Sequence, residues 1–323
     1  GIIYPIFLSV AESLGSYPDK NPRGFGAYIS VLLYVVTMCT GITFLTGYAA
    51  NTVAWALADQ MLGLHITWLQ WTTAFILLLI APYVMYLIYR PTLTKIDNVR
   101  IAREGLAAIG PMSSKEKILL CLFVLAIIGW ATSSYTKINS TAVVLGFIAV
   151  CLMTNVLKWK DIAKNSQVWT TLMWYGGILG LAGAMNQFGF FKWMAEQLQL
   201  YVDFSSFSHV ALLFTLVAAG SVCRYLFVSC GAYMASVLPV QFTIGLAAGL
   251  PAWDMFLVFL MCGVMGAILT HYANAAGPVL FGGGYVSVKT WWLIGLFFTL
   301  LSYIIFALVG VPYWSMLGLF TSL

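Results

Sequence analysis

Two groups of small and polar residues interrupt long apolar runs of this sequence, and both could bind a charged solute. The first group is Thr46, Asn51 and Thr52, and the second is Thr270, His271, Asn274, Ala275, Ala276, Gly277 and Pro278. A helix that stops inside a membrane leaves peptide N–H groups unpaired at one end and carbonyls at the other. The N–H end carries about half a positive charge and attracts anions, while carbonyls and hydroxyls suit cations. The two groups therefore predict helix breaks that bind a small anion.

A third group lies in the apolar region 208–250, which is too long for one membrane span and too short for two comfortable ones. Arg224, Ser229, Gly231 and Pro239 fall in its middle. The pattern predicts a re-entrant helical hairpin, whose irregular tip is tolerated only where it lines protein or water. Arg224 is the only charge deep within an apolar region, and an intramembrane charge is costly. It either complements the anion directly or holds carbonyls of the hairpin.

Each group also has a plainer interpretation. Serine, threonine and glycine mediate close contacts between membrane helices without any ligand. A lone histidine such as His271 is more often a hydrogen-bonded core residue than a functional one. For the groups at both breaks taken together, we favour binding over packing.

The elements that carry these groups must be membrane helices. Hydrophobic residues make up 62% of the 323-residue chain and charged residues 8%, whereas a soluble domain carries about 25% charged residues. The mean hydropathy is +0.94, and the apolar runs are long, unlike the short alternating strands of a membrane barrel. We therefore predict an all-α, polytopic transmembrane fold. Its spans are expected at 26–58, 69–89, 118–134, 141–157, 169–197, 208–250, 253–288 and 291–312.

The charges of the connecting segments predict the orientation of the chain. Segment 90–117 holds six basic and three acidic residues, so the positive-inside rule makes it cytoplasmic. The next inside loop is 158–167. If 208–250 is a hairpin that enters and leaves from outside, the carboxyl terminus lies outside as well.

The first break is partly repeated in the second. Residues 45–51 read LTGYAAN, and residues 269–274 read LTHYAN. Segments 1–89 and 235–312 therefore resemble two copies of one unit, and the predicted orientation runs them in opposite directions. This is the inverted-repeat signature of secondary transporters. The hairpin tip of the first copy would fall before Gly1, so we expect an amino-terminally truncated fragment.

Other classes of function find little support in the sequence. Asp59, Glu196, Asp203 and Asp254 all lie near predicted helix ends, whereas a proton pump usually keeps a carboxylate in mid-membrane. The sequence has no metal-ligand cluster, nucleophile elbow or phosphate loop, so we do not expect an enzyme. It also lacks the basic stripe with interleaved aromatic residues that is typical of nucleic-acid binding.

A set of short motifs runs the length of the chain. They are Gly1–Ile6, Phe44–Gly47 followed by Asn51, Gly110–Lys117, Tyr225–Phe227 followed by Ser229, Leu238–Val240, Leu269–Ala273, and Phe281–Gly282 with Gly284–Tyr285. These motifs resemble the divalent anion:sodium symporter family. The similarity is greatest to its branch of citrate/succinate and tartrate/succinate exchangers and of plastid 2-oxoglutarate/malate translocators.

The resemblance implies a homodimeric transporter of the elevator type, in which a transport domain moves against a scaffold. Segments 1–89, which is incomplete, and 206–323 would form the transport domain. Segment 118–205 would belong to the scaffold, and 90–117 would be a cytoplasmic connector.

The resemblance also implies a binding site. In the family, a Ser-Asn-Thr hairpin tip contacts substrate carboxylate and sodium, and this tip maps onto Ser229, Cys230 and Gly231, where only the serine is kept. The family's asparagine in the first broken helix maps onto Asn51, and the second broken helix maps onto 274–278. Substrate contacts are therefore expected from Asn51, Thr52, Ser229, Cys230, Gly231, Asn274, Ala275, Ala276, Gly277 and Pro278, and ion or anion contacts from Thr46, Arg224, Thr270 and His271.

The resemblance predicts secondary active transport of a di- or tricarboxylate, of the malate, succinate, citrate, tartrate or 2-oxoglutarate class, by exchange or sodium coupling. Sodium is the only cofactor expected, and lipid is an expected partner. We place the chain in a bacterial inner membrane in preference to the plastid envelope. Two alternatives remain open, namely a carrier of an inorganic anion such as sulfate or arsenite, and a non-coupled anion channel.

Overall fold

The computed structural model describes residues 3–80, 82, 83, 87, 103, 107, 110–201, 203, 204 and 207–321. Every regular element in this part of the chain is a helix. Most of the predicted connector 90–117 and the end of the predicted span 69–89 lie outside the described residues.

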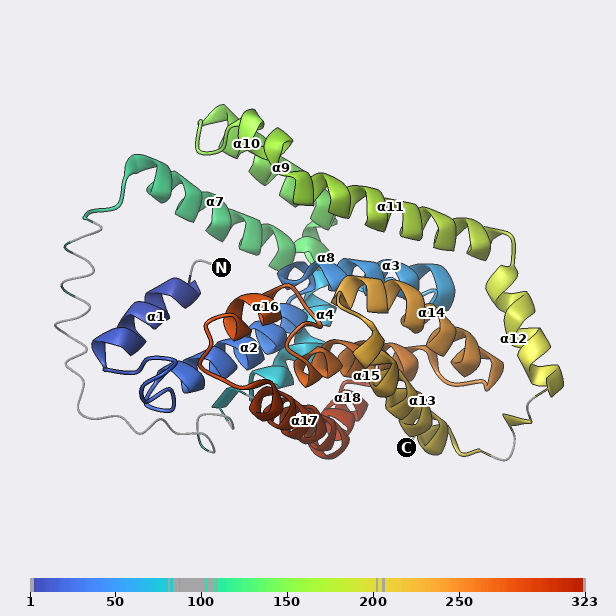
Figure 1. Ribbon diagram of the computed structural model, residues 1–323. Helices are drawn as coiled ribbons and strands as arrows, with labels where there is room; N and C mark the ends of the chain where they lie inside the picture. Colours follow the sequence, from blue (N-terminus) through green and yellow to red (C-terminus); the bar gives the residue numbers. More distant parts are fainter. Residues whose placement is uncertain are drawn as a thin grey trace. The chain divides into compact units, whose positions relative to one another are not determined.

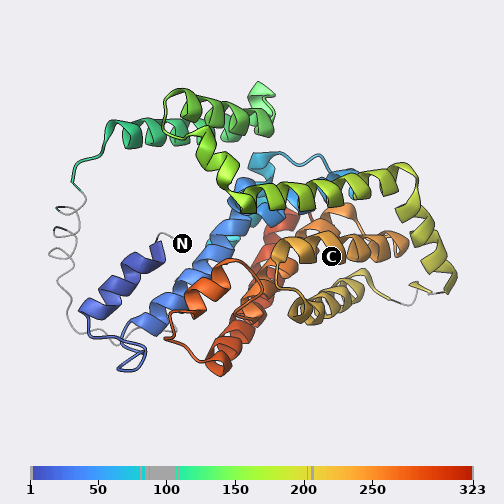
Figure 2. The same cartoon turned by 45° about the horizontal axis from the view of Figure 1, so that its top comes forward.

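The helices follow one another along the chain as Figure 1 shows, and Figure 2 gives a second view. Their bounds are α1 (Ile3–Ser13), α2 (Gly26–Thr43), η1 (Leu45–Gly47), α3 (Ala49–Leu62), α4 (Trp68–Phe75), η2 (Ile76–Leu79), α7 (Ser114–Ala131), α8 (Ser133–Thr136), α9 (Ser140–Met153), α10 (Trp159–Lys164), α11 (Ser166–Gln187), α12 (Phe190–Tyr201), α13 (His209–Cys223), η4 (Arg224–Leu226), α14 (Cys230–Ala247), α15 (Ala252–Met265), η5 (Gly266–Leu269), α16 (Ala276–Phe281), α17 (Val288–Ile305), η6 (Phe306–Gly310) and α18 (Val311–Met316). The chain forms two compact units. One comprises Gly1–Ile66, Ala74–Thr92 and Ile178–Leu323, and the other comprises Thr67–Thr73 and Leu93–Gly177.

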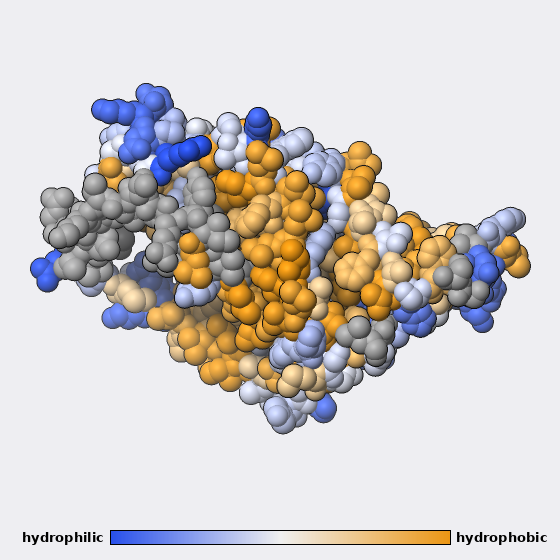
Figure 3. All heavy atoms as spheres, turned by 90° about the horizontal axis from the view of Figure 1, so that it is seen from below, coloured by the Kyte–Doolittle hydropathy of each residue, from blue (hydrophilic) through white to orange (hydrophobic). Residues whose placement is uncertain are grey.

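The predicted all-α membrane fold is confirmed. Among the described residues, five helical stretches are long and apolar enough to cross a bilayer, namely Gly26–Thr43, His209–Leu226, Cys230–Ala247, Ala252–Leu269 and Val288–Met316. Large apolar side chains point outward on them, such as Leu293 and Leu300 of α17, which are 58% and 51% exposed. Figure 3 shows apolar side chains gathered in a broad band on one face. Such a surface suits lipid rather than water.

The predicted spans 169–197 and 208–250 each divide into two longer helices. The single span expected at 169–197 is wrong, because α11 ends at Gln187 and α12 begins at Phe190. Gly189, between them, has a φ of +72°, a left-handed conformation that ends a helix and that glycine adopts without strain. The region 208–250 forms the predicted pair of helices, α13 and α14, which pack together and are joined at a tip that contains η4.

Both predicted helix breaks are present. The first broken helix is α2–η1–α3, in which Phe44 and Tyr48 have extended backbones on either side of η1. The second is α15–η5–α16, in which Thr270 is extended and residues 270–275 separate η5 from α16. Each broken helix is followed by another helix, α4 in the first copy and α17 in the second.

The first broken helix lies antiparallel to the second. Near the start of α2, Gly26 approaches the ring of Tyr285, so that a Cβ on Gly26 would lie 2.0 Å from it. Further along α2, the Tyr34 hydroxyl donates to the carbonyls of Thr270 at 2.8 Å and Ala267 at 2.7 Å. Residue numbers rise along α2 while those of its partners fall. The two copies therefore run in opposite directions, as the orientation predicted from the loop charges requires.

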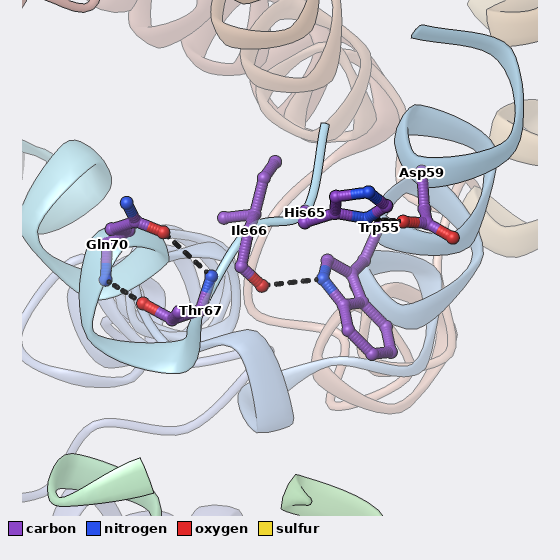
Figure 4. Close-up of polar contacts among 6 residues, drawn as sticks. All are labelled: Trp55, Asp59, His65, Ile66, Thr67 and Gln70. Carbon is purple, nitrogen blue, oxygen red and sulfur yellow. Dashed lines mark hydrogen bonds and ion pairs between the residues drawn. The ribbon is translucent and has the colours of Figure 1, made fainter. Parts of the chain in front are cut away.

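The end of the first broken helix is fixed by local bonds (Figure 4). α3 ends at Leu62, and the next residue, Gly63, has a φ of +66° that lets its N–H bond back to the Asp59 carbonyl. Beyond this turn, the Ile66 carbonyl accepts a bond of 2.8 Å from the Trp55 indole, and His65 pairs with Asp59 at 2.5 Å. The chain is thereby tied to the last turns of α3 before α4 begins.

The second unit is held by aromatic contacts between short helices. The rings of Phe123 in α7 and Phe147 in α9 meet edge to face with centroids 6.0 Å apart. Trp68 at the start of α4 stacks on Trp130 at 6.3 Å. α7 begins with a capping box, in which Ser113 and Glu116 bond to each other's backbone N–H groups.

Candidate functional site

At the first break, Asn51 closes the end of α2. Its side-chain amide donates to the carbonyls of Gly41 at 2.8 Å and Phe44 at 2.9 Å, and the residue is fully buried. A Cβ on Gly47 would lie 2.7 Å from the Gly41 carbonyl, so only glycine fits there. The Oδ1 of Asn51 is buried and has no partner among the described residues. The break thus offers one acceptor oxygen inside the protein.

The two predicted threonines of this break, Thr46 and Thr52, are exposed, whereas Asn51 is buried. The hydroxyl of Thr52 donates to the Ala49 carbonyl of its own helix at 2.7 Å.

At the second break, Asn274 joins the start of α16 to α2. Its Oδ1 accepts bonds from the amides of Ala276 at 2.8 Å and Gly277 at 3.0 Å. Its Nδ2 donates to the Tyr34 hydroxyl at 2.8 Å and to the Met38 sulfur at 3.2 Å. The sequence predicts that the free amides at the start of α16 face an anion. In the structure, the amides of Ala276 and Gly277 bond to Asn274 instead. Asn274 therefore acts here as the cap of α16.

His271 and Tyr272, which precede Asn274, each form contacts with a different element. His271 accepts a bond of 3.1 Å from the indole of Trp292 in α17 and lies against the ring of Phe281, 4.4 Å away. The Tyr272 hydroxyl donates to the Tyr225 carbonyl in the hairpin tip at 2.9 Å. The hydroxyl of Thr270 is buried without a partner in the described part of the chain. The second break therefore presents an unpaired oxygen, as the first one does.

In the hairpin tip, Ser229 is the N-terminal cap of α14. Its hydroxyl accepts a bond of 3.4 Å from the amide of Ala232. Cys230 and Gly231 are both buried in the first turn of α14, and α14 packs against α3 of the first broken helix. The hairpin thus contacts the first broken helix through α14.

Arg224 binds backbone oxygens. It is fully buried, and its guanidinium donates to the Ala273 carbonyl of the second break. It also lies 3.5 Å from the carbonyls of Phe227 and Ser229, and its Cζ is 5.0 Å from the centroid of the Tyr233 ring. Of the two roles open to Arg224 from the sequence, the structure shows the holding of carbonyls.

The predicted groups therefore meet at the hairpin tip. Ser229, Cys230, Gly231 and Arg224 share this tip, and the hairpin contacts both broken helices. Sequence reasoning missed two residues that connect them, namely Tyr34 and Tyr272. The YA pair that follows His271, and that also follows Gly47, signals Tyr272, whereas no sequence pattern marks Tyr34.

Two further features limit what the described residues can bind. They include no group of three or more His, Cys, Asp and Glu side chains that could hold a metal ion. A cavity of about 150 Å³ is lined by apolar residues of α13, α15, α17 and α18, including Leu213, Met261 and Trp314. None of the predicted site residues lines it, so it is separate from the breaks.

Comparisons with known proteins give consistent matches. The family model described as sodium:sulfate symporter transmembrane region matches residues 1–320. The chain is 39% identical over 322 residues to "Inner membrane protein YbhI" of Escherichia coli, covering 98% of this chain and 67% of the relative. It is 31% identical over 326 residues to "Putative malate transporter YflS" of Bacillus subtilis, covering 99% and 68%. It is also 31% identical over 327 residues to the citrate/succinate antiporter of Escherichia coli, covering 98% and 66%.

Proposed function

The chain belongs to the divalent anion:sodium symporter family of integral membrane transporters, and on that premise we propose that it carries di- or tricarboxylates across a bacterial inner membrane. Two of its relatives are named for malate and for citrate/succinate, and one for the inner membrane. The chain is thus a transporter and not an enzyme. Exchange or sodium coupling drives the proposed transport.

The observation that carries this proposal is the meeting of two antiparallel broken helices at one hairpin. α14 of the hairpin packs against α3 of the first broken helix, and Arg224 of the tip binds the Ala273 carbonyl of the second break. In secondary transporters, discontinuous helices from two inverted repeats bind substrate and coupling ion near the middle of the membrane. We assign Ser229 and Asn274 to the substrate, and Asn51, whose amide hydrogens are donated to Gly41 and Phe44, to the coupling ion beside it.

The residues at the breaks also fit sodium. Asn51 Oδ1 and Thr270 Oγ1, one at each break, are buried oxygens for which the described part of the chain supplies no partner. Sodium is a hard cation that binds amide, hydroxyl and carbonyl oxygens, and the extended backbone around each break supplies carbonyls. When bound, sodium would add positive charge beside the anion. Asn51 and Thr270 would each offer one oxygen to a sodium ion at its own break.

We further propose the elevator arrangement and the homodimer of the family for this chain. Segments 1–89 and 206–323 then move as the transport domain against the scaffold helices of 118–205. Support comes from bonds that join the two copies, such as that between Tyr34 and Asn274. The Gln199 side chain of α12 donates to the Ala247 carbonyl of α14 at 2.6 Å and connects the proposed scaffold to the hairpin.

Competition for uptake of labelled succinate tests the substrate class. The full-length protein is reconstituted in liposomes with and without sodium, and malate, citrate, tartrate and sulfate are added in turn. We expect saturable uptake, competition by the carboxylates and counterflow from vesicles loaded with unlabelled succinate. Competition by sulfate alone would make the protein an inorganic-anion carrier. Flux without saturation or counterflow would make it a channel.

A further inference from the structure

The hairpin tip and the second break exchange a reciprocal pair of hydrogen bonds. Arg224 of the tip donates to the Ala273 carbonyl of the break, and Tyr272 of the break donates to the Tyr225 carbonyl of the tip at 2.9 Å. Each segment thus supplies one side-chain donor and one backbone acceptor. We propose that this pair is a latch that fixes the tip against the second break and thereby positions the substrate-binding groups.

The Arg224 half of the latch depends on the shape of the guanidinium. The same planar group that reaches Ala273 also faces the carbonyls of Phe227 and Ser229, 3.5 Å away. A guanidinium presents five N–H donors in a rigid fork, whereas a lysine ammonium is a single point charge. Arginine can therefore hold the tip's own loop and the break at once.

The Tyr272 half of the latch comes from the residue next to Ala273. Residues 270–275 are not helical, so the buried Ala273 carbonyl needs a donor from elsewhere, which Arg224 supplies. Tyr272 in turn donates to the exposed carbonyl of Tyr225 in the tip. With Arg224 on Ala273 and Tyr272 on the tip, Asn274 follows directly after two anchored residues. The latch thus sets where Asn274 lies relative to Ser229.

A latch of this kind affects affinity rather than the maximum rate. Both Ser229 and Asn274 are assigned to the substrate, so this consequence rests on the proposed function. Loss of an interaction that is equal in the bound and translocating states raises KM and leaves the turnover rate unchanged. One neutral hydrogen bond contributes about 1 kcal/mol, which corresponds to a change of about fivefold in KM.

The first test compares two tyrosine variants. Tyr272→Phe removes the donor of the latch and keeps the ring. Tyr225→Phe is the matched control, because Tyr225 contributes its carbonyl and not its hydroxyl. In liposomes, we expect Tyr272→Phe to raise the KM for succinate about fivefold at unchanged maximum rate, and Tyr225→Phe to behave as wild type. Equal KM values in the two variants would overturn the latch, as would a fall in maximum rate alone.

The second test does not depend on the substrate. Cys230 at the tip is 1% exposed, and Cys39 in α2 is fully buried. The rate of alkylation by N-ethylmaleimide is followed at each cysteine by mass spectrometry. We expect Tyr272→Phe to speed alkylation of Cys230 about fivefold, the factor of one hydrogen bond, with Cys39 unchanged. Faster reaction at both cysteines would show general loosening and would overturn the proposal, as would no change at either.

The two tests also separate this inference from the proposed function. If the protein carries no carboxylate but Cys230 alone becomes reactive in Tyr272→Phe, the latch stands and the substrate assignment falls. If carboxylate uptake is confirmed and Tyr272→Phe matches Tyr225→Phe in both tests, the latch falls alone.

Discussion

The side-chain amide of Asn274 donates a hydrogen bond of 2.8 Å to the hydroxyl of Tyr34, which lies 240 positions earlier in the chain. The same hydroxyl shares its one proton between the carbonyls of Ala267 and Thr270. One buried oxygen therefore ties the first copy of the repeat to both sides of the second break. The position of Asn274 depends on a residue in the opposite copy.

Tyr34→Phe should destabilise the protein and lower the affinity for substrate. The change leaves the Asn274 amide and two carbonyls without their partner, and an unsatisfied buried polar group costs about 1–3 kcal/mol. The measurement is the Tm of the purified protein together with the KM for succinate. Tyr135→Phe is the control, because Tyr135 is 83% exposed. A Tyr34→Phe protein with the Tm and KM of the control would contradict this role.

Asn51→Ala and Asn274→Ala should each abolish uptake while expression is retained. Asn51→Ala frees the carbonyls of Gly41 and Phe44 and removes the buried oxygen, and Asn274→Ala uncaps α16. Uptake of labelled succinate is measured at matched protein levels. Asn186→Ala serves as the control, since this asparagine is exposed on α11. Wild-type kinetics in both variants would exclude the two asparagines from the site.

Gly277→Ala should lower the Tm and the uptake rate more than Gly180→Ala does. A Cβ at this position would lie 2.3 Å from the His271 carbonyl, so the first turn of α16 would have to move. Overpacking of this kind costs about 1–3 kcal/mol. Gly180→Ala, where nothing lies within 4 Å, should be neutral or slightly stabilising. Both are compared by Tm and by uptake, and equal values for the two variants would refute the close approach.

The start of α7 should loosen in acid. Bonds from the backbone N–H and then the hydroxyl of Ser113 hold the pKa of the Glu116 carboxyl below its ordinary value of 4.5. Because the folded pKa is the lower one, the stabilisation is complete above 4.5 and is lost as the pH falls through the folded pKa. Hydrogen exchange of the amides at 114–118, corrected for intrinsic rates, should therefore accelerate below this value.

A serine variant checks the origin of this pH effect. In Ser113→Ala the exchange at 114–118 should already be fast at neutral pH and should lose its dependence on acid. Ser114→Ala leaves the cap intact and should retain the wild-type profile. If Ser113→Ala keeps that profile too, the capping box does not protect the helix start.

The helix breaks and the hairpin could be predicted because they interrupt apolar runs with residues that a continuous membrane helix does not need. Asn51 and Asn274 belong to such interruptions. Their sequence match identified the two copies, and the loop charges predicted that the copies run in opposite directions. The break at Gly189 was missed because apolar residues on both sides make 169–197 read as one span. A single glycine is tolerated inside many membrane helices, so its left-handed backbone is not visible from the sequence.

The contacts that position the site could not be predicted. Tyr34 is one of many aromatic residues in an apolar helix, and its acceptors lie more than 230 positions away, at separations of 233 and 236. Arg224 could be singled out by its charge, but its partners are carbonyls, which every residue possesses. Only the fold shows which of them face the guanidinium. The amides of α16 likewise appeared available until the structure placed Asn274 on them.

The three oxygens that receive the Arg224 guanidinium all belong to the main chain. These carbonyl acceptors remain when the side chain at 227, 229 or 273 is substituted. Any substitution at 224, by contrast, removes the donor from all three. A mutant library built to alter solute selectivity can therefore vary the side chains at 227 and 273 without removing an acceptor from the guanidinium. Arg224 is the position that such a library should leave untouched.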